Sequence, residues 1–357
     1  MSVPAKPVVS RFEFWHPILF YAPLVPYYAW LAIRHRSITL PSAVNPSIYS
    51  GGICRESKSQ ILDLVPAEHR DSIAKYAVFR QTGPLPTEER VTGALEAAKA
   101  NSINLPFVAK PDEGQRGDGV QKINTAADLR EYLRTFPQTV PLILQELVEW
   151  PGEAGVLYYR HPDLRQGVIL SITLKELPRV MGDGIRSVRQ LIDADPRAKL
   201  MAAVYIKRQG PSADRVPAPG ESVPLVFAGN HCQGAIFRDG TRLATPELLA
   251  RFAAVSDAMP EFYFGRFDVK YQDLSEFLAG GDFKAVEINA ASAESTHIWD
   301  AEMTLLGAYK ALFLQFRVLF EIGSANRRRG HHTIGAVRLL KDFWDYKRQA
   351  KEYPPTS

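Results

Sequence analysis

The sequence predicts an α+β enzyme of two lobes, and three observations carry this prediction. Between about residues 75 and 300, short apolar runs typical of strands are interspersed with segments whose apolar residues recur at helical spacing. Several of these runs follow one another across short polar turns, as the strands of antiparallel hairpins do. The 357 residues are enough for a large core divided between two or three lobes.

The composition, 46% hydrophobic and 23% charged, is that of an ordinary soluble globular enzyme. The two cysteines, Cys54 and Cys232, lie far apart without metal-ligand spacing, which favours a reduced, cytoplasmic compartment over a disulfide scaffold. The net charge of +4 is uneven, because residues 326–357 hold eight Lys or Arg and three Asp or Glu, a balance of +5. This basic end indicates an anionic partner, such as lipid headgroups or nucleic acid, or a solvated tail.

The N-terminal residues 12–33 are almost wholly apolar and dense in aromatic side chains. The stretch has the roughly 20 residues that a spanning helix needs, but three prolines interrupt it. Aromatic residues next to Arg34 and Arg36 are typical of a membrane–water interface. Interfacial or re-entrant attachment, peripheral on the inner face of the membrane, is the first interpretation. A true span is the second, and an arm packed on the protein's own core is the third.

Local patterns predict the other elements in turn. Residues 37–57 are rich in Ser, Pro, Gly and Asn and are expected to form a loop or linker, followed by a helix over residues 58–75. A helix over residues 125–135 is expected to begin at Thr125, with Asp128 three residues on. Two more helices are expected at residues 185–195 and 245–259, and strands at residues 106–111, 140–147, 155–160, 167–176, 265–272 and 283–290.

Polar side chains interrupt the last two predicted strands. Glu287 and Asn289 are two positions apart in an apolar strand, so they share one face at roughly 6–7 Å. Asp268 and Arg266 share a face of the preceding strand. If the two strands pair, two carboxylates converge, and they repel each other unless a cation lies between them. Such all-oxygen ligands suit Mg²⁺, and a solvated sheet face is the alternative.

Two further patterns suggest phosphate and nucleotide binding. Lys110 ends a strand and is followed by Gly114, Gly117 and Gly119, where backbone N–H groups could approach phosphate oxygens and the lysine could supply charge. The spacing matches neither the dinucleotide fingerprint nor the Walker loop. After a buried strand, the backbone following Glu146 could read an adenine edge, and a carboxylate seven positions on could accept hydrogen bonds from ribose.

Together and in this order, these motifs resemble the ATP-grasp superfamily over roughly residues 75–300. The string KPDEGQRGDGV resembles its lysine and flexible phosphate loop, and QELVEWPGE resembles the adenine–ribose hinge of D-alanine–D-alanine ligases. GRFDV followed by VEIN resembles their metal-binding strands. The run LPRVMGDGIRSVRQLI is similar to a segment of cyanophycin synthetases and fused glutathione synthetases, with Ser187 where that pattern prefers threonine. The resemblance implies a two-lobed ATP-grasp fold, with the nucleotide between two antiparallel-sheet lobes and an atypical aromatic N-terminal segment.

The resemblance also implies site residues. Asp268, Glu287 and Asn289 would hold Mg²⁺, and Arg266 with Lys175 would act on the transferring phosphoryl group. An earlier lysine is expected to contact ATP, and Lys75 is preferred to Lys58 because a strand-like run follows it. The expected ATP-binding residues are Lys75, Lys110, Gly114, Gly117, Gly119, Glu146, Leu147, Val148 and Glu153.

The implied activity is an ATP-dependent ligase that activates a carboxylate as an acyl phosphate for attack by an amine or thiol, releasing ADP and phosphate. The alternatives are an ATP-grasp phosphotransferase and a membrane-attached protein that binds nucleotide without turnover. The expected partners are small-molecule carboxylates and amines, a membrane surface or a second copy of the chain, but not nucleic acid. The expected division is an N-terminal segment and linker at 1–57, a catalytic domain at 58–320 and a basic helical tail at 321–357.

Overall fold

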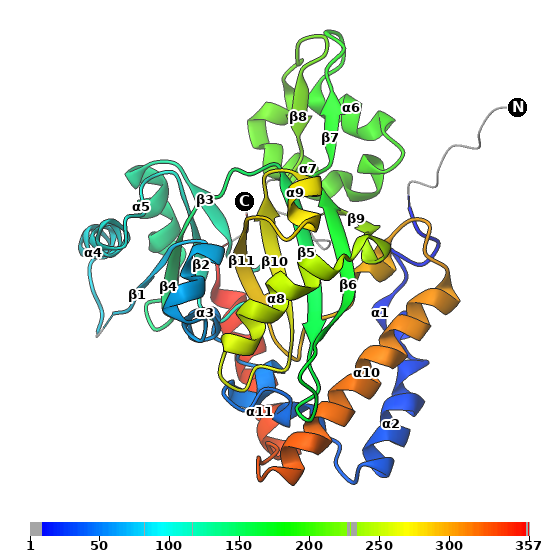
Figure 1. Ribbon diagram of the computed structural model, residues 1–357. Helices are drawn as coiled ribbons and strands as arrows, with labels where there is room; N and C mark the ends of the chain where they lie inside the picture. Colours follow the sequence, from blue (N-terminus) through cyan, green and yellow to red (C-terminus); the bar gives the residue numbers. More distant parts are fainter. Residues whose placement is uncertain are drawn as a thin grey trace, which may run out of the picture.

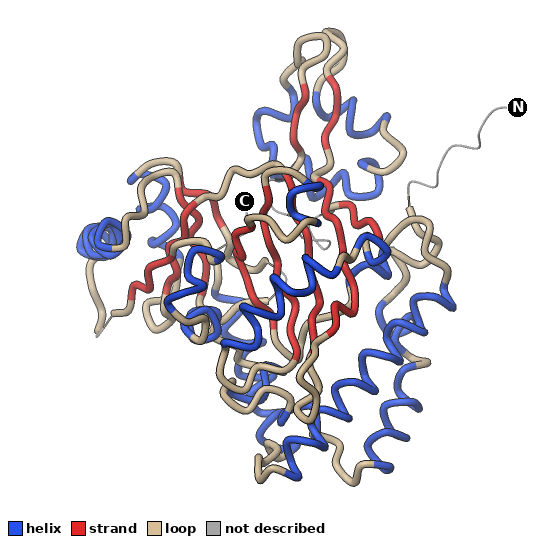
Figure 2. Tube along the Cα trace, viewed as in Figure 1, coloured by secondary structure: helices blue, strands red, loops and turns tan. Residues whose placement is uncertain are grey.

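A computed structural model describes residues 9–354 and 356, apart from residues 82, 116, 227–228 and 230–233. Two antiparallel sheets form two lobes, with helices outside them and a small third unit at the top (Figures 1 and 2). This is the α+β, two-lobed architecture that the sequence predicts.

The smaller lobe is a four-stranded antiparallel sheet in the order β1-β4-β2-β3, with two helices packed on it (Figure 1). Thr125 and Asp128 form a reciprocal capping box at the start of the second helix, which confirms the predicted helix boundary. Phe107, Leu133 and Leu144 belong to the core between sheet and helices. The elements are β1 (Tyr76–Phe79), α4 (Thr87–Ala100), β2 (Phe107–Pro111), β3 (Gln121–Ile123), α5 (Ala126–Thr135) and β4 (Leu142–Glu146).

The larger lobe is a five-stranded antiparallel sheet in the order β11-β10-β5-β6-β9. The hairpin predicted near residues 155–176 is present as β5 and β6, and the two strands with interrupting polar residues pair as β10 and β11. One face packs on helices that carry Phe252 and Phe277, and the other face carries polar side chains and also packs on α10 (Leu305–Arg328) through Leu157. The elements are β5 (Gly152–Tyr159), β6 (Val168–Glu176), β9 (Ile236–Asp239), α8 (Pro246–Ala258), β10 (Phe264–Tyr271), α9 (Leu274–Leu278) and β11 (Phe283–Asn289).

The predicted helix at residues 58–75 is shorter than expected. Helix α3 (Lys58–Asp63) ends before Pro66, and a 3₁₀ segment (Ala67–Ser72) follows. Proline lacks the backbone N–H that would continue the helix and restricts the residue before it, which accounts for the early end.

A small unit projects from the larger lobe at the top of Figure 1. It consists of the hairpin β7 (Arg179–Met181) and β8 (Ser222–Pro224) with α6 (Val188–Ala194) and α7 (Ala202–Gln209). Ser187 caps α6, so serine performs here the capping that a threonine would also provide. The unit has its own buried cluster around Ile192 and Tyr205.

The aromatic N-terminal segment packs on the protein's own helix α10 (Leu305–Arg328), as the third interpretation supposed (Figure 1). Its helices are α1 (Pro17–Tyr21) and α2 (Leu24–Arg34). Phe12 and Phe20 are buried beside Leu312 of α10. Across the described ranges, no helix combines the length and hydropathy required to cross a membrane.

Two segments outside the sheets pack against other parts of the chain. The residues expected to form a loop or linker include a buried 3₁₀ turn (Leu40–Ala43) that packs on α10. The basic tail forms α11 (Ala336–Gln349), and Asp342 within it is buried and accepts a hydrogen bond from Tyr49.

Candidate functional site

A cavity of about 610 Å³ lies where the two sheets face each other. Its walls come from both lobes, the glycine-rich loop, the N-terminal segment and Thr356 near the chain's end. The size is in the range of small-molecule sites. Most of the residues that the sequence motifs single out line this one cavity: Lys110, Gly114, Gly117, Glu146, Leu147, Val148, Glu153, Lys175, Arg266, Asp268, Glu287 and Asn289.

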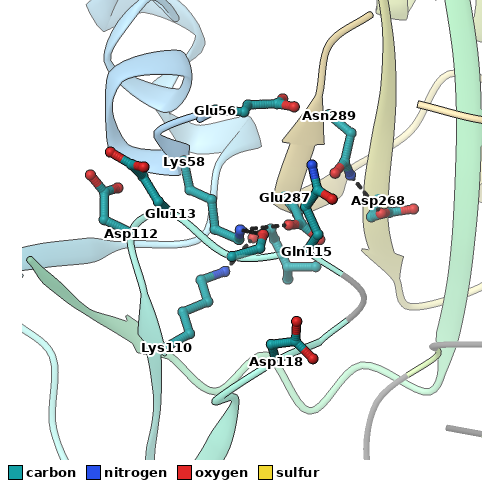
Figure 3. Close-up of polar contacts among 12 residues, drawn as sticks. Glu56, Lys58, Lys110, Asp112, Glu113, Gln115, Asp118, Asp268, Glu287 and Asn289 are labelled. Atoms are coloured by element: carbon teal, nitrogen blue, oxygen red, sulfur yellow. Dashed lines mark hydrogen bonds and ion pairs between the residues drawn. The ribbon is translucent and has the colours of Figure 1, made fainter. Parts of the chain in front are cut away.

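Strands β10 and β11 place the polar patch as the alternation of side chains predicts. Asp268 is the direct register partner of Glu287, and Arg266 is that of Asn289. Figure 3 shows Asp268, Glu287 and Asn289 on these neighbouring strands, with a hydrogen bond between Asn289 and Asp268. The two carboxylates therefore lie on one face of one sheet, next to each other.

The carboxylate of Asp268 is surrounded by hydrogen-bond donors. Arg266 donates to both of its oxygens at 3.1 Å, Lys175 approaches one at 2.9 Å, and Asn289 donates to the other at 3.0 Å. A carboxylate has about four acceptor positions, so these contacts use all of them. Burial raises the pKa of Asp268, but Arg266 and Lys175 outweigh burial and hold it below its ordinary value.

Lys110 crosses from the smaller lobe to the larger one. Its ammonium group donates to Gln145 Oε1 at 2.8 Å within its own lobe and to the Val286 carbonyl at 3.0 Å in β11 (Figure 3). Burial lowers the pKa of Lys110 to about 8, partly offset by the nearby charge of Glu287. Lys110 thus lies beside β11, the strand that carries Glu287. An anion bound next to Lys110 would favour its charged form.

The structure reverses the preference between the two earlier lysines. The Lys75 side chain is exposed and borders a separate hollow with Tyr76 and Arg70, so Lys75 does not line the central cavity. Lys58 is buried, lines the central cavity and forms an ion pair with Glu287 at 3.4 Å. Its backbone N–H also donates to the Asp112 carbonyl, which ties the start of α3 to the glycine-rich loop.

Glu153 is buried among lysines. Its carboxylate forms ion pairs with Lys175 at 3.2 Å and with Lys270 at 2.9 Å. Burial raises its pKa, but the two lysines overcome this effect and lower it. Lys270 is not part of the sequence motifs, although it follows Arg266 and Asp268 at the same two-residue spacing and therefore shares their face of β10.

The glycine-rich loop is held by contacts at its carbonyl groups. Gly117 and Gly119 have φ of 80° and 69°, a conformation that glycine adopts without strain. The Gly114 carbonyl accepts from Lys58, and that of Gly119 accepts from Tyr132 at 2.8 Å. Arg116, in the middle of this loop, is outside the described residues.

The C-terminal tail also binds this loop, a contact that the sequence analysis missed. The Gln115 N–H donates to the Tyr346 hydroxyl at 2.8 Å, and Tyr353 donates to the Glu113 carbonyl at 2.6 Å. Thr356 donates to the Gly117 carbonyl at 2.7 Å. Three tail residues thus fix the conformation of the loop that is expected to cover phosphate.

The hinge residues lie where strand β4 ends. Glu146 is the last residue of β4, and its carboxylate accepts from the Lys75 backbone N–H at 2.8 Å. Leu147 and Val148 follow it and line the cavity. The carboxylate thus positions the chain, while the backbone after it borders the space expected for adenine.

Beyond Arg266 the cavity is walled by aromatic residues of the N-terminal segment and of the 3₁₀ turn Thr296–Trp299. Trp15, Tyr21 and Trp299 line this end together with Glu294. Ser292 lines the cavity, whereas Ser295 and His297, which follow it in the sequence, are buried and do not line it. His231 and Cys232 are outside the described residues.

The donor set at β10 and β11 fits magnesium in type. Asp268, Glu287 and Asn289 offer two carboxylates and one carboxamide, hard oxygen ligands of the kind that Mg²⁺ takes alongside water and phosphate. The described residues contain no group of three or more His, Cys, Asp or Glu arranged for a metal. A metal here would therefore depend on Asn289 and on ligands from the nucleotide.

Comparison with known proteins finds no matching family model and no matching curated protein. Among solved structures, the chain is similar to the D-Ala:D-Ser ligase from Enterococcus faecalis (15% identity, TM-score 0.41, covering 77% of this chain and 63% of that one). It is also similar to the D-alanine–D-alanine ligase from Bacillus anthracis (12% identity, TM-score 0.41, covering 79% of this chain and 70% of that one). A third match is the bifunctional glutathione synthetase from Pasteurella multocida (16% identity, TM-score 0.36, covering 76% of this chain and 38% of that one).

The chain thus spans 38% of the glutathione synthetase and 63% of the D-Ala:D-Ser ligase. These identities and TM-scores carry no argument about what the chain binds or does. The chain's own topology shows the two-lobed arrangement that the motifs predict. Two antiparallel sheets face each other, with Lys110 on one and the Asp268–Glu287 pair on the other.

Proposed function

We propose that the protein is an ATP-dependent ligase that converts a carboxylate to an acyl phosphate and transfers the acyl group to an amine or a thiol. One observation carries the proposal: Lys110 of one sheet meets the β11 strand beside Glu287, directly opposite Asp268, inside a cavity large enough for a nucleotide and a second substrate. The proposed products are the amide or thioester, ADP and phosphate.

The central cluster has the charge balance that a triphosphate requires. Its bases are Lys58, Lys110, Lys175, Arg266 and Lys270, and its acids are Glu153, Asp268 and Glu287, a balance of +2. Fixed cations at a developing phosphate charge lower the barrier without a protein nucleophile. The absence of a Ser–His or Cys–His pair from the motifs is therefore consistent with the chemistry.

The proposed roles follow from position. Lys58 and Lys110 bind phosphate oxygens, and the loop of Gly114, Gly117 and Gly119 covers them. The backbone of Leu147 and Val148 reads adenine, with Glu146 fixing the strand end. Glu153 holds Lys175 and Lys270 in place and is also the residue proposed to face the ribose.

The remaining roles concern the reacting end. Asp268, Glu287 and Asn289 would hold Mg²⁺, which would neutralise charge on the β- and γ-phosphates. Arg266 stabilises the transferring phosphoryl group and then the oxyanion of the tetrahedral intermediate. Lys175, which lies 2.9 Å from Asp268, contacts the transferring phosphoryl group.

The test is a screen of carboxylates with Mg-ATP and hydroxylamine, which traps acyl phosphates as hydroxamates. Carboxylate-dependent ADP release with hydroxamate formation supports the proposal. A stable phosphorylated carboxylate that accumulates when no hydroxylamine, amine or thiol is added would instead indicate a phosphotransferase. A melting shift with Mg-ATP but no ADP release under any condition would indicate a binding protein.

We also propose that the exposed side of the N-terminal helices contacts an anionic membrane surface. Ile33 and Trp30 are 79% and 50% exposed, and Arg34 and Arg36 lie beside them on the surface. Exposed apolar side chains next to bases suit an anionic bilayer surface. Flotation with anionic vesicles tests this, and Ile33→Glu should abolish the binding; self-association through the same side chains would appear as a dimer without vesicles.

A further inference from the structure

The carboxylate of Glu294 is held at the aromatic end of the cavity by two side chains from distant parts of the chain. The Tyr21 hydroxyl donates to its Oε1 at 2.6 Å, and the Trp299 indole N–H donates to its Oε2 at 3.3 Å. All three residues line the cavity. The N-terminal segment therefore completes a carboxylate site that the two lobes alone do not contain.

Among the described residues, the carboxylate of Glu294 has no ion-pair partner within 4 Å, although the charge of Arg266 is near enough to interact with it. Glu13, another carboxylate in this wall, is matched by Arg197 at 2.6 and 3.2 Å. The donors to the carboxylate of Glu294 among the described residues are a phenol and an indole, which are uncharged. Each carboxylate oxygen retains a lone pair after accepting one such bond.

Aromatic rings surround this carboxylate. The ring of Phe20 lies 4.8 Å from that of Trp299 and 5.0 Å from that of Tyr21, and Trp15 lines the same wall. Rings of this kind attract an organic cation through their faces and repel an anion. A fixed carboxylate within such a wall is suited to an ammonium group on an aliphatic chain.

We propose that this site binds the acceptor amine in its ammonium form, with the charge on Glu294 and the adjacent carbons against Tyr21 and Trp299. The proposal rests on the proposed ligase function and names its acceptor as a cationic aliphatic amine. The site lies next to the reaction centre, because Arg266 donates both to the Glu294 carbonyl at 3.1 Å and to Asp268.

This arrangement sorts the two substrates by charge. The carboxylate substrate faces Arg266 and Lys175, which attract it, whereas Glu294 repels it. The ammonium ion loses a proton to solvent before reacting. Its nitrogen then forms a bond to the acyl carbon, the bond from that carbon to the phosphate oxygen breaks, phosphate leaves, and the nitrogen releases its second proton.

Binding is tested without turnover by following tryptophan fluorescence while n-butylammonium chloride or sodium butyrate is added to the full-length protein. The ammonium salt should give a saturable change that Trp299→Phe diminishes, and butyrate should give none. Glu294→Gln keeps the shape of the side chain and should weaken the binding about tenfold or more, because a hydrogen-bonded charge is lost. Equal responses to both salts, or an unchanged affinity in Glu294→Gln, overturn the proposal.

Kinetic measurements with two acceptors test the ammonium site and the ligase function independently. Hydroxylamine is uncharged near pH 7.5, so its reaction reports acyl phosphate formation without using an ammonium site. Glu294→Gln should raise the KM for butylamine about tenfold, while the KM for ATP and the hydroxylamine rate stay unchanged. A parallel loss with hydroxylamine, or a drop in urea stability that explains the change, shows a structural role for Glu294 and overturns the proposal. No hydroxamate at all, with ammonium binding intact, refutes the ligase function alone.

Discussion

Neutralising either of the two opposed carboxylates should abolish Mg-ATP binding, but the two substitutions should differ sharply in their effect on folding. Glu287 has a side chain that is 30% exposed and a single ion pair, with Lys58 at 3.4 Å. Water screens this partly exposed carboxylate, so the pair contributes about 1 kcal/mol although Lys58 is buried. Glu287→Gln should therefore lower the free energy of unfolding by about that amount, which is less than the loss of a fully buried pair costs.

Asp268 is in a different position. Its side chain is 6% exposed and accepts from Arg266, Lys175 and Asn289. Asp268→Asn removes the charge that pairs with the half-buried Arg266 and the buried side chain of Lys175, and breaking a buried pair on one side costs about 3–5 kcal/mol. The substitution should therefore lower the free energy of unfolding by that amount.

Urea unfolding followed by circular dichroism measures the free energy of unfolding, and calorimetric titration measures the affinity for Mg-ATP. The matched pair is informative because both substitutions replace a carboxylate with its amide at register partners on one sheet face. Equal destabilisation of the two variants would refute the assignment of the buried charge network to Asp268. Unchanged Mg-ATP affinity in Glu287→Gln would refute the metal assignment.

Three other outcomes follow from the same geometry. Folding lowers the pKa of Lys110 from 10.5 to about 8, so between these pH values the unfolded state binds more protons than the folded state. The free energy of unfolding should therefore rise with pH in this range, by at most about 1.4 kcal/mol per pH unit. Urea unfolding at several pH values measures this rise, and Lys110→Met, which lacks the titrating group, is the reference. Gly229→Ala places a methyl group 2.3 Å from Glu153 Oε1, so it should displace the Glu153–Lys175 pair and raise the KM for ATP. Gly335→Ala is the control for added bulk, because Gly335 has open space around it and a φ of −64°. Tyr346→Phe removes the acceptor of the Gln115 N–H and should speed amide exchange in residues 113–119 without changing exchange in the five-stranded sheet.

The fold and the grouping of polar side chains on β10 and β11 could be predicted because each depends on local sequence patterns. Alternation along two strands places Asp268, Glu287 and Asn289 on shared faces whatever the rest of the chain does. Thr125 and Asp128 likewise mark the start of a helix by themselves. Strands β10 and β11 are close in the sequence, and this closeness was enough to predict that they pair.

The errors concern residues whose position depends on distant contacts. Lys75 was preferred to Lys58 because a strand follows it, but Lys58 reaches the cavity through the bond between its backbone and Asp112, which no local pattern contains. Hydropathy alone could not show that Phe12 and Phe20 pack on α10 instead of a membrane. The same holds for Tyr346, whose contact with the glycine-rich loop joins segments about 230 positions apart.

The crowding of donors around Asp268 has a consequence for the order in which ligands arrive. A lone divalent cation would meet a carboxylate already shielded by two positive side chains, and nothing would compensate the displacement of Lys175. A nucleotide that carries its own cation supplies that compensation, since its phosphates accept the released ammonium group. Metal and nucleotide should consequently enter as a single species, and the resting protein should be indifferent to magnesium salts by themselves.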